Sequence, residues 1–175
     1  KVITHADLII FANMVDNVKK YSKDFMDLYE SLGNLEAMYA IASYRTLLRE
    51  GEGKLGFCVP VFKEGKTIDM KNGYHSLLSE PVANDINAKC GVLITGSNAS
   101  GKSTFLKTVA INLLFAQTLY TCTASEFMTF HTDILSSMTL RDDIEGGDSY
   151  YMVEIKALKR IVDFVKKKAK IVAFV

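Results

Sequence analysis

Hydrophobic residues recur at helical spacing through residues 1–50 of the chain. A first helix is predicted over residues 6–20 by the apolar positions Leu8, Phe11, Val15 and Val18. Ser22 and Asn34 are residue types that cap helix N-termini, and they predict two further helices, the last over residues 35–49. The two glycines that follow, Gly51 and Gly53, favour a helix stop. The pattern therefore predicts a helical segment over residues 1–50 that ends at a domain boundary.

Beyond that boundary the pattern changes to short apolar runs separated by helices. Strands are predicted over residues 57–62, 67–70, 91–95, 127–130, 135–140 and 171–175. One long helix is predicted over residues 102–121, and Ser149 can cap another whose apolar positions lie between Tyr151 and Val165. Because strands alternate with helices, we expect residues 51–175 to form a mostly parallel α/β sheet.

Charge and cysteine content narrow the class of protein. The 175 residues carry 21 Lys and Arg against 20 Asp and Glu, so the basic excess of a stand-alone nucleic-acid binder is missing. No C-x-x-C pair occurs, and buried reduced thiols are expected at the three cysteines, Cys58, Cys90 and Cys122. The most apolar stretch, residues 105–124, is interrupted by Lys107, Asn112 and Gln117. With no signal-peptide pattern either, we expect a soluble, cytoplasmic protein.

One segment carries specific chemistry. Residues 96–103 read Gly-Ser-Asn-Ala-Ser-Gly-Lys-Ser, a phosphate-binding P-loop (Walker A) between a predicted strand and a predicted helix. Gly96 and Gly101 allow the backbone to approach a phosphate closely, and the N-terminus of the following helix favours an anion. Lys102 supplies a charge for the β- and γ-phosphates, and Ser103 supplies a hydroxyl ligand for Mg²⁺. The sequence thus predicts binding of ATP and Mg²⁺, with further loop contacts from Ser97, Asn98, Ala99, Ser100 and Thr104.

Two segments resemble the ATPase domain of MutS-type proteins. Residues 94–104 are similar to that family's T-G-x-N-x-x-G-K-S-T loop, in which an Asn at the position of Asn98 separates it from most other P-loops. Residues 141–155 resemble the family's D-D-x-x-x-G-x-S-T-F-M-V-E-M segment, with Tyr150-Tyr151 in place of Thr-Phe. The second similarity is the more specific of the two.

Weaker similarities extend the resemblance over nearly the whole chain. Residues 32–37 look like the end of the family's helical lever, and residues 73–75 resemble the G-R-H segment that precedes the nucleotide site. Residues 81–84 stand where an adenine-contacting loop is expected. The resemblance therefore implies that Val82 and Asn84 also contact the nucleotide.

The resemblance implies both a fold and a paired mechanism. The expected fold is a P-loop NTPase sheet of the ABC type with flanking helices, in which residues 1–50 form a helical lever or connector and residues 51–175 the ATPase domain. MutS-type ATPases pair head to tail, which implies that Ser149 of one subunit acts in trans at the γ-phosphate held by the other subunit's Lys102. On the residues alone, a helix N-cap is the favoured role of Ser149, and the role in trans comes from the resemblance.

The implied function is ATP-dependent work on DNA. The parent protein is expected to bind ATP and ADP, to form a homodimer, and to couple ATP binding and hydrolysis to DNA repair. Contacts with DNA, including mismatched DNA, are expected mostly outside this segment. No element that reads mismatches is recognisable in the sequence itself.

The two ends suggest a piece of a longer protein. The chain begins at Lys1 within amphipathic sequence and ends on an apolar strand pattern at Val175. Hydrolysis in this family needs an acidic pair (Walker B) after such a strand, one carboxylate for Mg²⁺ and one for the attacking water. The chain ends where that pair would begin, so this piece is expected to bind nucleotide and to hydrolyse it poorly or not at all.

Three other functions compete with this interpretation. Another ABC-related machine, such as a chromosome-structure ATPase or a transporter subunit, would carry an L-S-G-G-Q-like element where residues 147–151 read Gly-Asp-Ser-Tyr-Tyr. A nucleotide-gated dimerisation module would bind ATP without turnover. A nucleotide kinase is disfavoured because no arginine-rich lid segment follows the loop.

The remaining polar clusters have ordinary explanations. A solvated helix C-terminus, favoured over a DNA-facing patch, is expected for the basic run Lys166, Lys167, Lys168 and Lys170. No metal-ligand spacing is found among the histidines, His5, His75 and His131. A solvated loop is expected for the acidic residues Asp142, Asp143 and Glu145.

Overall fold

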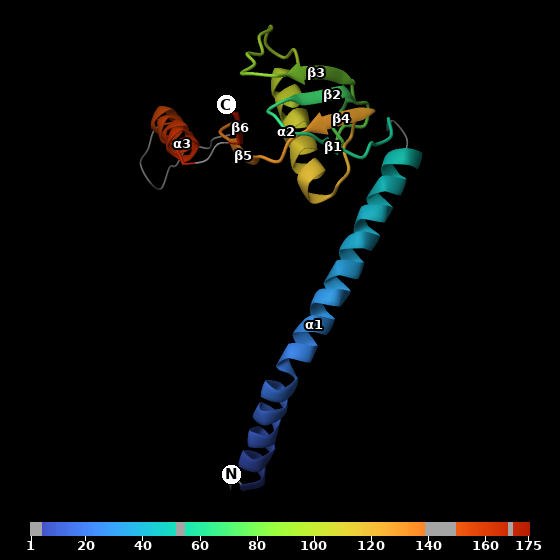
Figure 1. Cartoon of the computed structure of the whole chain (residues 1–175), viewed down its shortest axis with the longest axis vertical. Helices are drawn as coiled ribbons and strands as arrows, with labels where there is room; N and C mark the ends of the chain where they lie inside the picture. The colour runs from blue at the N-terminus through green and yellow to red at the C-terminus, as the bar shows by residue number, and fades with distance from the viewer. Residues whose placement is uncertain (1–4, 52–54, 139–149, 168–169) are drawn as a thin grey trace. The chain divides into compact units, whose positions relative to one another are not determined.

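A single long helix forms the first part of the chain (Figure 1). The computed structural model describes residues 5–51, 55–138, 150–167 and 170–175, and the chain divides into two compact units, Lys1–Tyr44 and Arg45–Val175. Helix α1 (His5–Glu50) passes through Ser22 and the Gly33-Asn34 pair without a break, so the expectation of three helices is wrong. The segment contains no proline, and a lone glycine inside a helix costs only about 1 kcal/mol relative to alanine.

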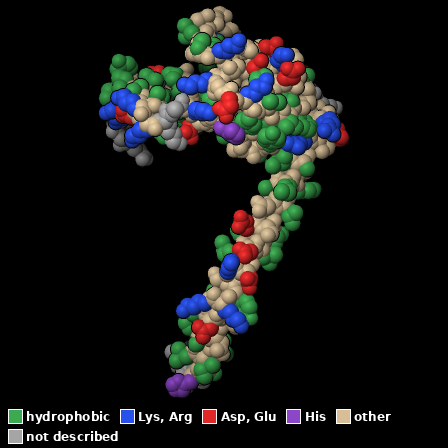
Figure 2. Space-filling model, in the orientation of Figure 1, with side chains coloured by type: hydrophobic (Ala, Val, Ile, Leu, Met, Phe, Trp, Pro, Cys, Tyr) green, Lys and Arg blue, Asp and Glu red, His purple; other side chains and the backbone are tan. Residues whose placement is uncertain are grey.

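The described part of the first unit has no hydrophobic core. Large apolar side chains lie on the surface of α1 (Figure 2), with exposed fractions of 67% for Phe11, 66% for Phe25 and 77% for Tyr39. The first described side chain that is buried in α1 is Leu48, which belongs to the second unit. The core of the described chain therefore lies in the second unit.

The second unit is a mixed α/β fold with two small sheets. Four strands pair in the order β1-β4-β2-β3, with bounds β1 (Val61–Phe62), β2 (Ile68–Gly73), β3 (Asn84–Ala88) and β4 (Glu126–Thr129). Only β1 and β4 are parallel in this sheet, because β2 runs antiparallel to both β3 and β4. A second, parallel sheet consists of β5 (Asp133–Ser136) and β6 (Ile171–Phe174). The helices of this unit are α2 (Lys102–Thr118) and α3 (Tyr150–Val165).

This arrangement confirms the mixed α/β class and corrects two finer expectations. The larger sheet is not mostly parallel, since β2 reverses direction between its two neighbours. Residues 91–95 do not form the predicted strand, and Leu93 within them is 88% exposed. A strand needs a hydrogen-bonded neighbour, and none of the described strands pairs with this segment.

Helix α2 is buried against the sheets through one face. Val109, Leu113 and Ala116 of α2 join a core cluster that also contains Met70 of β2 and Phe127 of β4. Apolar residues of the smaller sheet, including Phe174, complete the same cluster. One core thus fixes the axis of α2, and with it the direction in which its N-terminus points.

The polar residues that interrupt α2 have internal hydrogen-bond partners. Asn112 is fully buried: its side-chain amide donates to Thr108 O at 3.0 Å, and its Oδ1 accepts the backbone N–H of Thr123 at 2.7 Å. Gln117 Oε1 accepts the backbone N–H of Thr132 at 2.9 Å. These two side chains therefore tie α2 to the segments before and after β4.

We predict that Asn112→Ala lowers the free energy of unfolding by about 1–3 kcal/mol, because the buried Thr123 N–H loses its acceptor. Urea denaturation followed by circular dichroism measures the change. Asn87→Ala is the matched control, since Asn87 is exposed on β3 and its loss should shift stability by less than about 0.5 kcal/mol. Equal effects of the two substitutions would contradict the role assigned to Asn112.

Candidate functional site

The loop that precedes α2 is curled. The backbone N–H of Ser100 donates to Ser97 O at 3.4 Å, and Ala99 and Gly101 have left-handed backbone angles, with φ of 60° and 88°. Gly101 is the N-cap residue of α2 and makes no side-chain cap hydrogen bond. Because the first N–H groups of a helix have no intrahelical acceptor, this terminus is suited to an anion.

Lys102 lies over the curled loop. Its Nζ donates to Gly96 O at 2.7 Å and to Ser97 O at 2.5 Å. The side chain is half-buried, and these two hydrogen bonds hold its ammonium group beside the loop carbonyls at the N-terminus of α2. The positive end of the helix dipole and the lysine charge therefore act at the same place.

A pocket of about 710 Å³ opens beside this loop. Six residues predicted to bind the phosphates line it, namely Gly96, Ser97, Ser100, Gly101, Lys102 and Thr104. Three others from the same prediction, Asn98, Ala99 and Ser103, are exposed and do not line it. The pocket thus faces the inner side of the curl and the first turn of α2.

The opposite wall comes from the chain around the start of β3. Val82 and Asn84, which the family resemblance singled out, both line the pocket. The Asn84 side-chain amide donates to Val82 O at 3.0 Å, which fixes the short turn between them. Val82 is 77% exposed, so an apolar surface is presented next to the phosphate-type loop. The structure therefore brings together, at one pocket, the Val82–Asn84 turn and the curled loop, which are separated in the sequence.

Sequence reasoning missed several residues of this pocket. Two carboxylates, Glu80 and Asp85, line it, as do Phe105 and Thr108 of α2. His75, by contrast, belongs to the segment that the family resemblance placed before the nucleotide site; it lines the pocket too, and its Nδ1 accepts the backbone N–H of Leu77 at 3.3 Å. The acidic residues flank the Val82–Asn84 turn, and that proximity was the one available signal.

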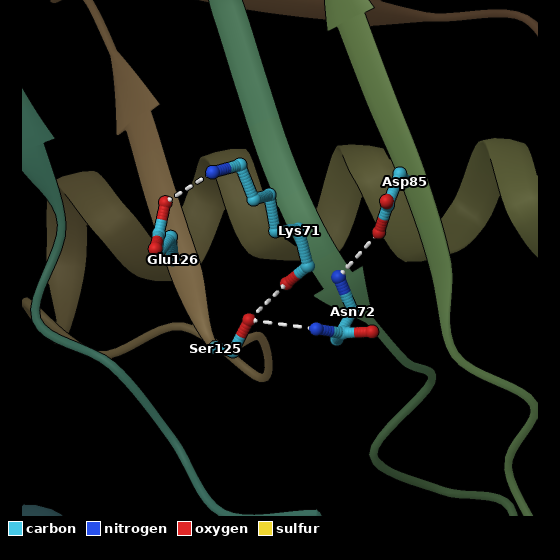
Figure 3. A network of polar contacts seen from close by, with 5 residues as sticks. All are labelled: Lys71, Asn72, Asp85, Ser125 and Glu126. Carbon is cyan, nitrogen blue, oxygen red and sulfur yellow. Dashed lines mark hydrogen bonds and ion pairs between the residues drawn. The ribbon is translucent and has the colours of Figure 1, made fainter.

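Asp85 belongs to a polar network that connects three strands (Figure 3). Its Oδ1 accepts the backbone N–H of Asn72 at 2.6 Å, and the Asn72 side-chain amide donates to Ser125 Oγ at 3.0 Å. An ion pair of 2.9 Å between Lys71 and Glu126 joins β2 to β4 and raises the pKa of the Lys71 ammonium. This network holds the β3 wall of the pocket against β2.

Other predicted residues lie away from the pocket lining or outside the described chain. Ser149 and the acidic residues Asp142, Asp143 and Glu145 fall outside the described residues, as does Lys168. Lys166 and Lys170 form ion pairs of 3.8 Å with Asp163 and 3.6 Å with Glu64. These ion pairs favour the solvated-surface interpretation of the basic run.

Two absences concern only the part of the chain that the structure describes. In residues 5–51, 55–138, 150–167 and 170–175, no three His, Cys, Asp or Glu side chains are grouped so that they could hold a metal ion. Over the same ranges, no helix has the length and apolar character needed to cross a membrane.

Comparison with known proteins points to one family. The family model of MutS domain V matches residues 92–173, which include the curled loop, α2 and α3. The DNA mismatch repair protein MutS of Thermotoga petrophila is 30% identical over 161 residues, covering 87% of this chain and 19% of the relative. That of Leptospira interrogans is 25% identical over 182 residues, covering 93% of this chain and 21% of the relative.

A third relative shows the same pattern of coverage. The DNA mismatch repair protein MutS of Alkaliphilus oremlandii is 28% identical over 153 residues, covering 81% of this chain and 17% of the relative. The chain thus spans about a fifth of the length of the curated relatives it matches. Together these matches support the assignment of the chain to the MutS family.

Proposed function

We propose that the pocket beside α2 binds ATP, with residues 96–104 around its phosphates. One observation carries this proposal: the uncapped N-terminus of α2, the Lys102 ammonium and the Val82–Asn84 wall all border a single pocket of about 710 Å³. Pockets that hold small molecules and cofactors commonly have volumes of about 300–1,000 Å³. The site therefore offers cationic and N–H donors at one side, and the apolar Val82 together with polar and acidic side chains at the other.

The loop is suited to exchange its internal contacts for phosphate oxygens. Lys102 Nζ donates to two backbone carbonyls, and hydrogen bonds from an ammonium to anionic oxygens are stronger than those to neutral ones. Gly101, at φ 88°, exposes the first N–H groups of α2 without a Cβ in that left-handed conformation. The triphosphate would then lie along the inner side of the curl.

Ser103 would hold Mg²⁺ together with the nucleotide. It is the second residue of α2, directly after Lys102, and its exposed hydroxyl is the oxygen type of ligand that Mg²⁺ takes. A Mg²⁺ site of this kind needs few protein ligands because phosphate oxygens and waters complete it. When bound, the ion would neutralise charge on the phosphates.

The wider function that we propose is that of a DNA mismatch repair ATPase. In this proposal residues 51–175 belong to a P-loop NTPase domain of the ABC type, and residues 1–50 form a lever or connector. The parent homodimer would couple ATP binding and hydrolysis to its action on DNA. The relatives are DNA mismatch repair proteins, which supports this choice over a transporter subunit or a nucleotide kinase.

We predict that Lys102→Ala reduces ATP affinity by roughly 10²–10⁴-fold, because about two charge-assisted hydrogen bonds of about 1.5–3 kcal/mol each are lost. Isothermal titration calorimetry with ATP and Mg²⁺ measures the affinity. Lys107→Ala is the matched control, since Lys107 is an exposed lysine of the same helix and does not line the pocket. Unchanged affinity in the folded Lys102 variant would refute the site.

We further predict that Ser149→Ala leaves ATP binding to the monomer unchanged and weakens ATP-dependent pairing. The expected reason is that a serine hydroxyl at a helix N-terminus would donate to the γ-phosphate held by the partner. Analytical ultracentrifugation with and without a non-hydrolysable ATP analogue measures pairing, with Ser22→Ala as the control. If both variants pair as the unchanged chain does, the role of Ser149 in trans is wrong.

A further inference from the structure

Cys58 and Cys122 lie opposite each other in an isolated antiparallel bridge. The backbone N–H of each residue donates to the carbonyl of the other at 2.9 Å. In such a hydrogen-bonded pair the two α-carbons are roughly 5.5 Å apart, which lies within the roughly 4.4–6.8 Å that a disulfide spans. The backbone therefore holds the two α-carbons at a separation that a disulfide can span, and the β-carbons, roughly 5 Å apart in such a pair, must approach by about 1 Å.

The two thiols also contact each other and differ in accessibility. The Cys122 S–H donates to Asn112 O at 3.5 Å, and the two thiols lie close enough for each to shift the pKa of the other. Cys122 is fully buried, whereas Cys58 is only partly buried. A reagent in solvent therefore reaches Cys58 first, and Cys122 can respond only from within the protein.

The environment of Cys58 favours its reaction. The hydrogen bond with Cys122 is the main cause that lowers the pKa of the Cys58 thiol, and burial opposes it. The same hydrogen bond, with burial, raises the pKa of the Cys122 thiol. Since the thiolate is the reactive nucleophile, the partly exposed member of the pair is also the more readily ionised one.

We propose that Cys58 and Cys122 form a redox-responsive pair that small-molecule disulfides convert to an internal disulfide. The Cys58 thiolate attacks one sulfur of the reagent RSSR and releases RS⁻, which takes up a proton, leaving a mixed disulfide on Cys58. The Cys122 thiol then attacks the Cys58 sulfur and gives up its proton, which the second RS⁻ takes up as it is released. The reagent is reduced to two thiols while the two cysteines are oxidised.

The disulfide would close a covalent loop of the chain that contains the candidate nucleotide pocket. Residues 58–122 contain β2, β3, the curled loop and α2, and hence all the described residues that line the pocket. Closing such a long loop reduces the freedom of the unfolded chain, so the oxidised form is expected to unfold at a temperature higher by roughly 5–15 °C. Formation of the disulfide does not depend on which ligand the pocket takes.

Oxidised glutathione and intact-mass spectrometry test the proposal. In the Cys90→Ala chain, which lacks the exposed third thiol, we expect loss of two hydrogen atoms, no lasting adduct, and a Cys58–Cys122 cross-link on peptide mapping. Adding Cys122→Ser should trap one glutathione on Cys58, whereas adding Cys58→Ser should leave the buried Cys122 unmodified. Circular dichroism in reductant establishes that each variant is folded.

Cys90 supplies the internal control for reactivity. It is exposed and, among the described residues, has no thiol partner, so the natural chain should carry glutathione there and not resolve it. A stable glutathione adduct on Cys58 in the Cys90→Ala chain would overturn the proposal. So would an unfolding temperature that oxidation leaves unchanged.

Discussion

The burial of α2 against the sheets is the constraint on which the candidate site depends. Asn112 stands at the centre of that contact, because it is fully buried and its Oδ1 accepts the Thr123 N–H. Leu113 and Val109 fill the core on the same face. With the helix axis fixed, Gly101 can turn the chain into a left-handed conformation, and the N-terminus of α2 opens toward the pocket. A mobile helix could not offer such a preorganised set of donors.

The other wall of the pocket is set by strand pairing. β3 pairs antiparallel with β2, and Asp85 of β3 accepts the backbone N–H of Asn72 in β2. The turn that precedes β3 places Val82 beside the loop, although the two segments are separated in sequence. The site is thus assembled from a helix end and a hairpin-like sheet edge, each held by its own hydrogen bonds.

Part of the candidate site could be predicted from the sequence, because it depends on residue types that are adjacent in the chain. The start of α2 at Lys102 followed from the Gly-Lys-Ser pattern, and the structure begins the helix at that residue. The prediction of a strand over residues 91–95 was wrong, because an apolar run does not reveal whether a neighbouring strand will pair with it. Asn112 and Gln117 interrupted an apolar stretch in the sequence, but their acceptor roles depend on segments brought close only by the fold. Glu80 and Asp85 escaped prediction for the same reason.

The family similarity and the geometry of the site are separate observations. MutS domain V matches residues 92–173, and the curled loop, the N-terminus of α2 and the pocket are the features on which the proposed nucleotide site rests. The Cys58–Cys122 bridge adds a feature that neither the loop motif nor the resemblance would suggest. Both the proposed nucleotide site and the proposed thiol pair depend on the same framework of α2, β2 and β4.

An amide NMR titration of the ¹⁵N-labelled chain with a non-hydrolysable ATP analogue and Mg²⁺ tests directly whether the curled loop before α2 binds the phosphates. If the curled loop holds the phosphates, saturable shifts should be largest at the backbone N–H groups of residues 97–104, with smaller shifts at Val82 and Asn84. Saturable binding that leaves those loop amides unmoved, or the absence of any binding, would contradict that role of the loop.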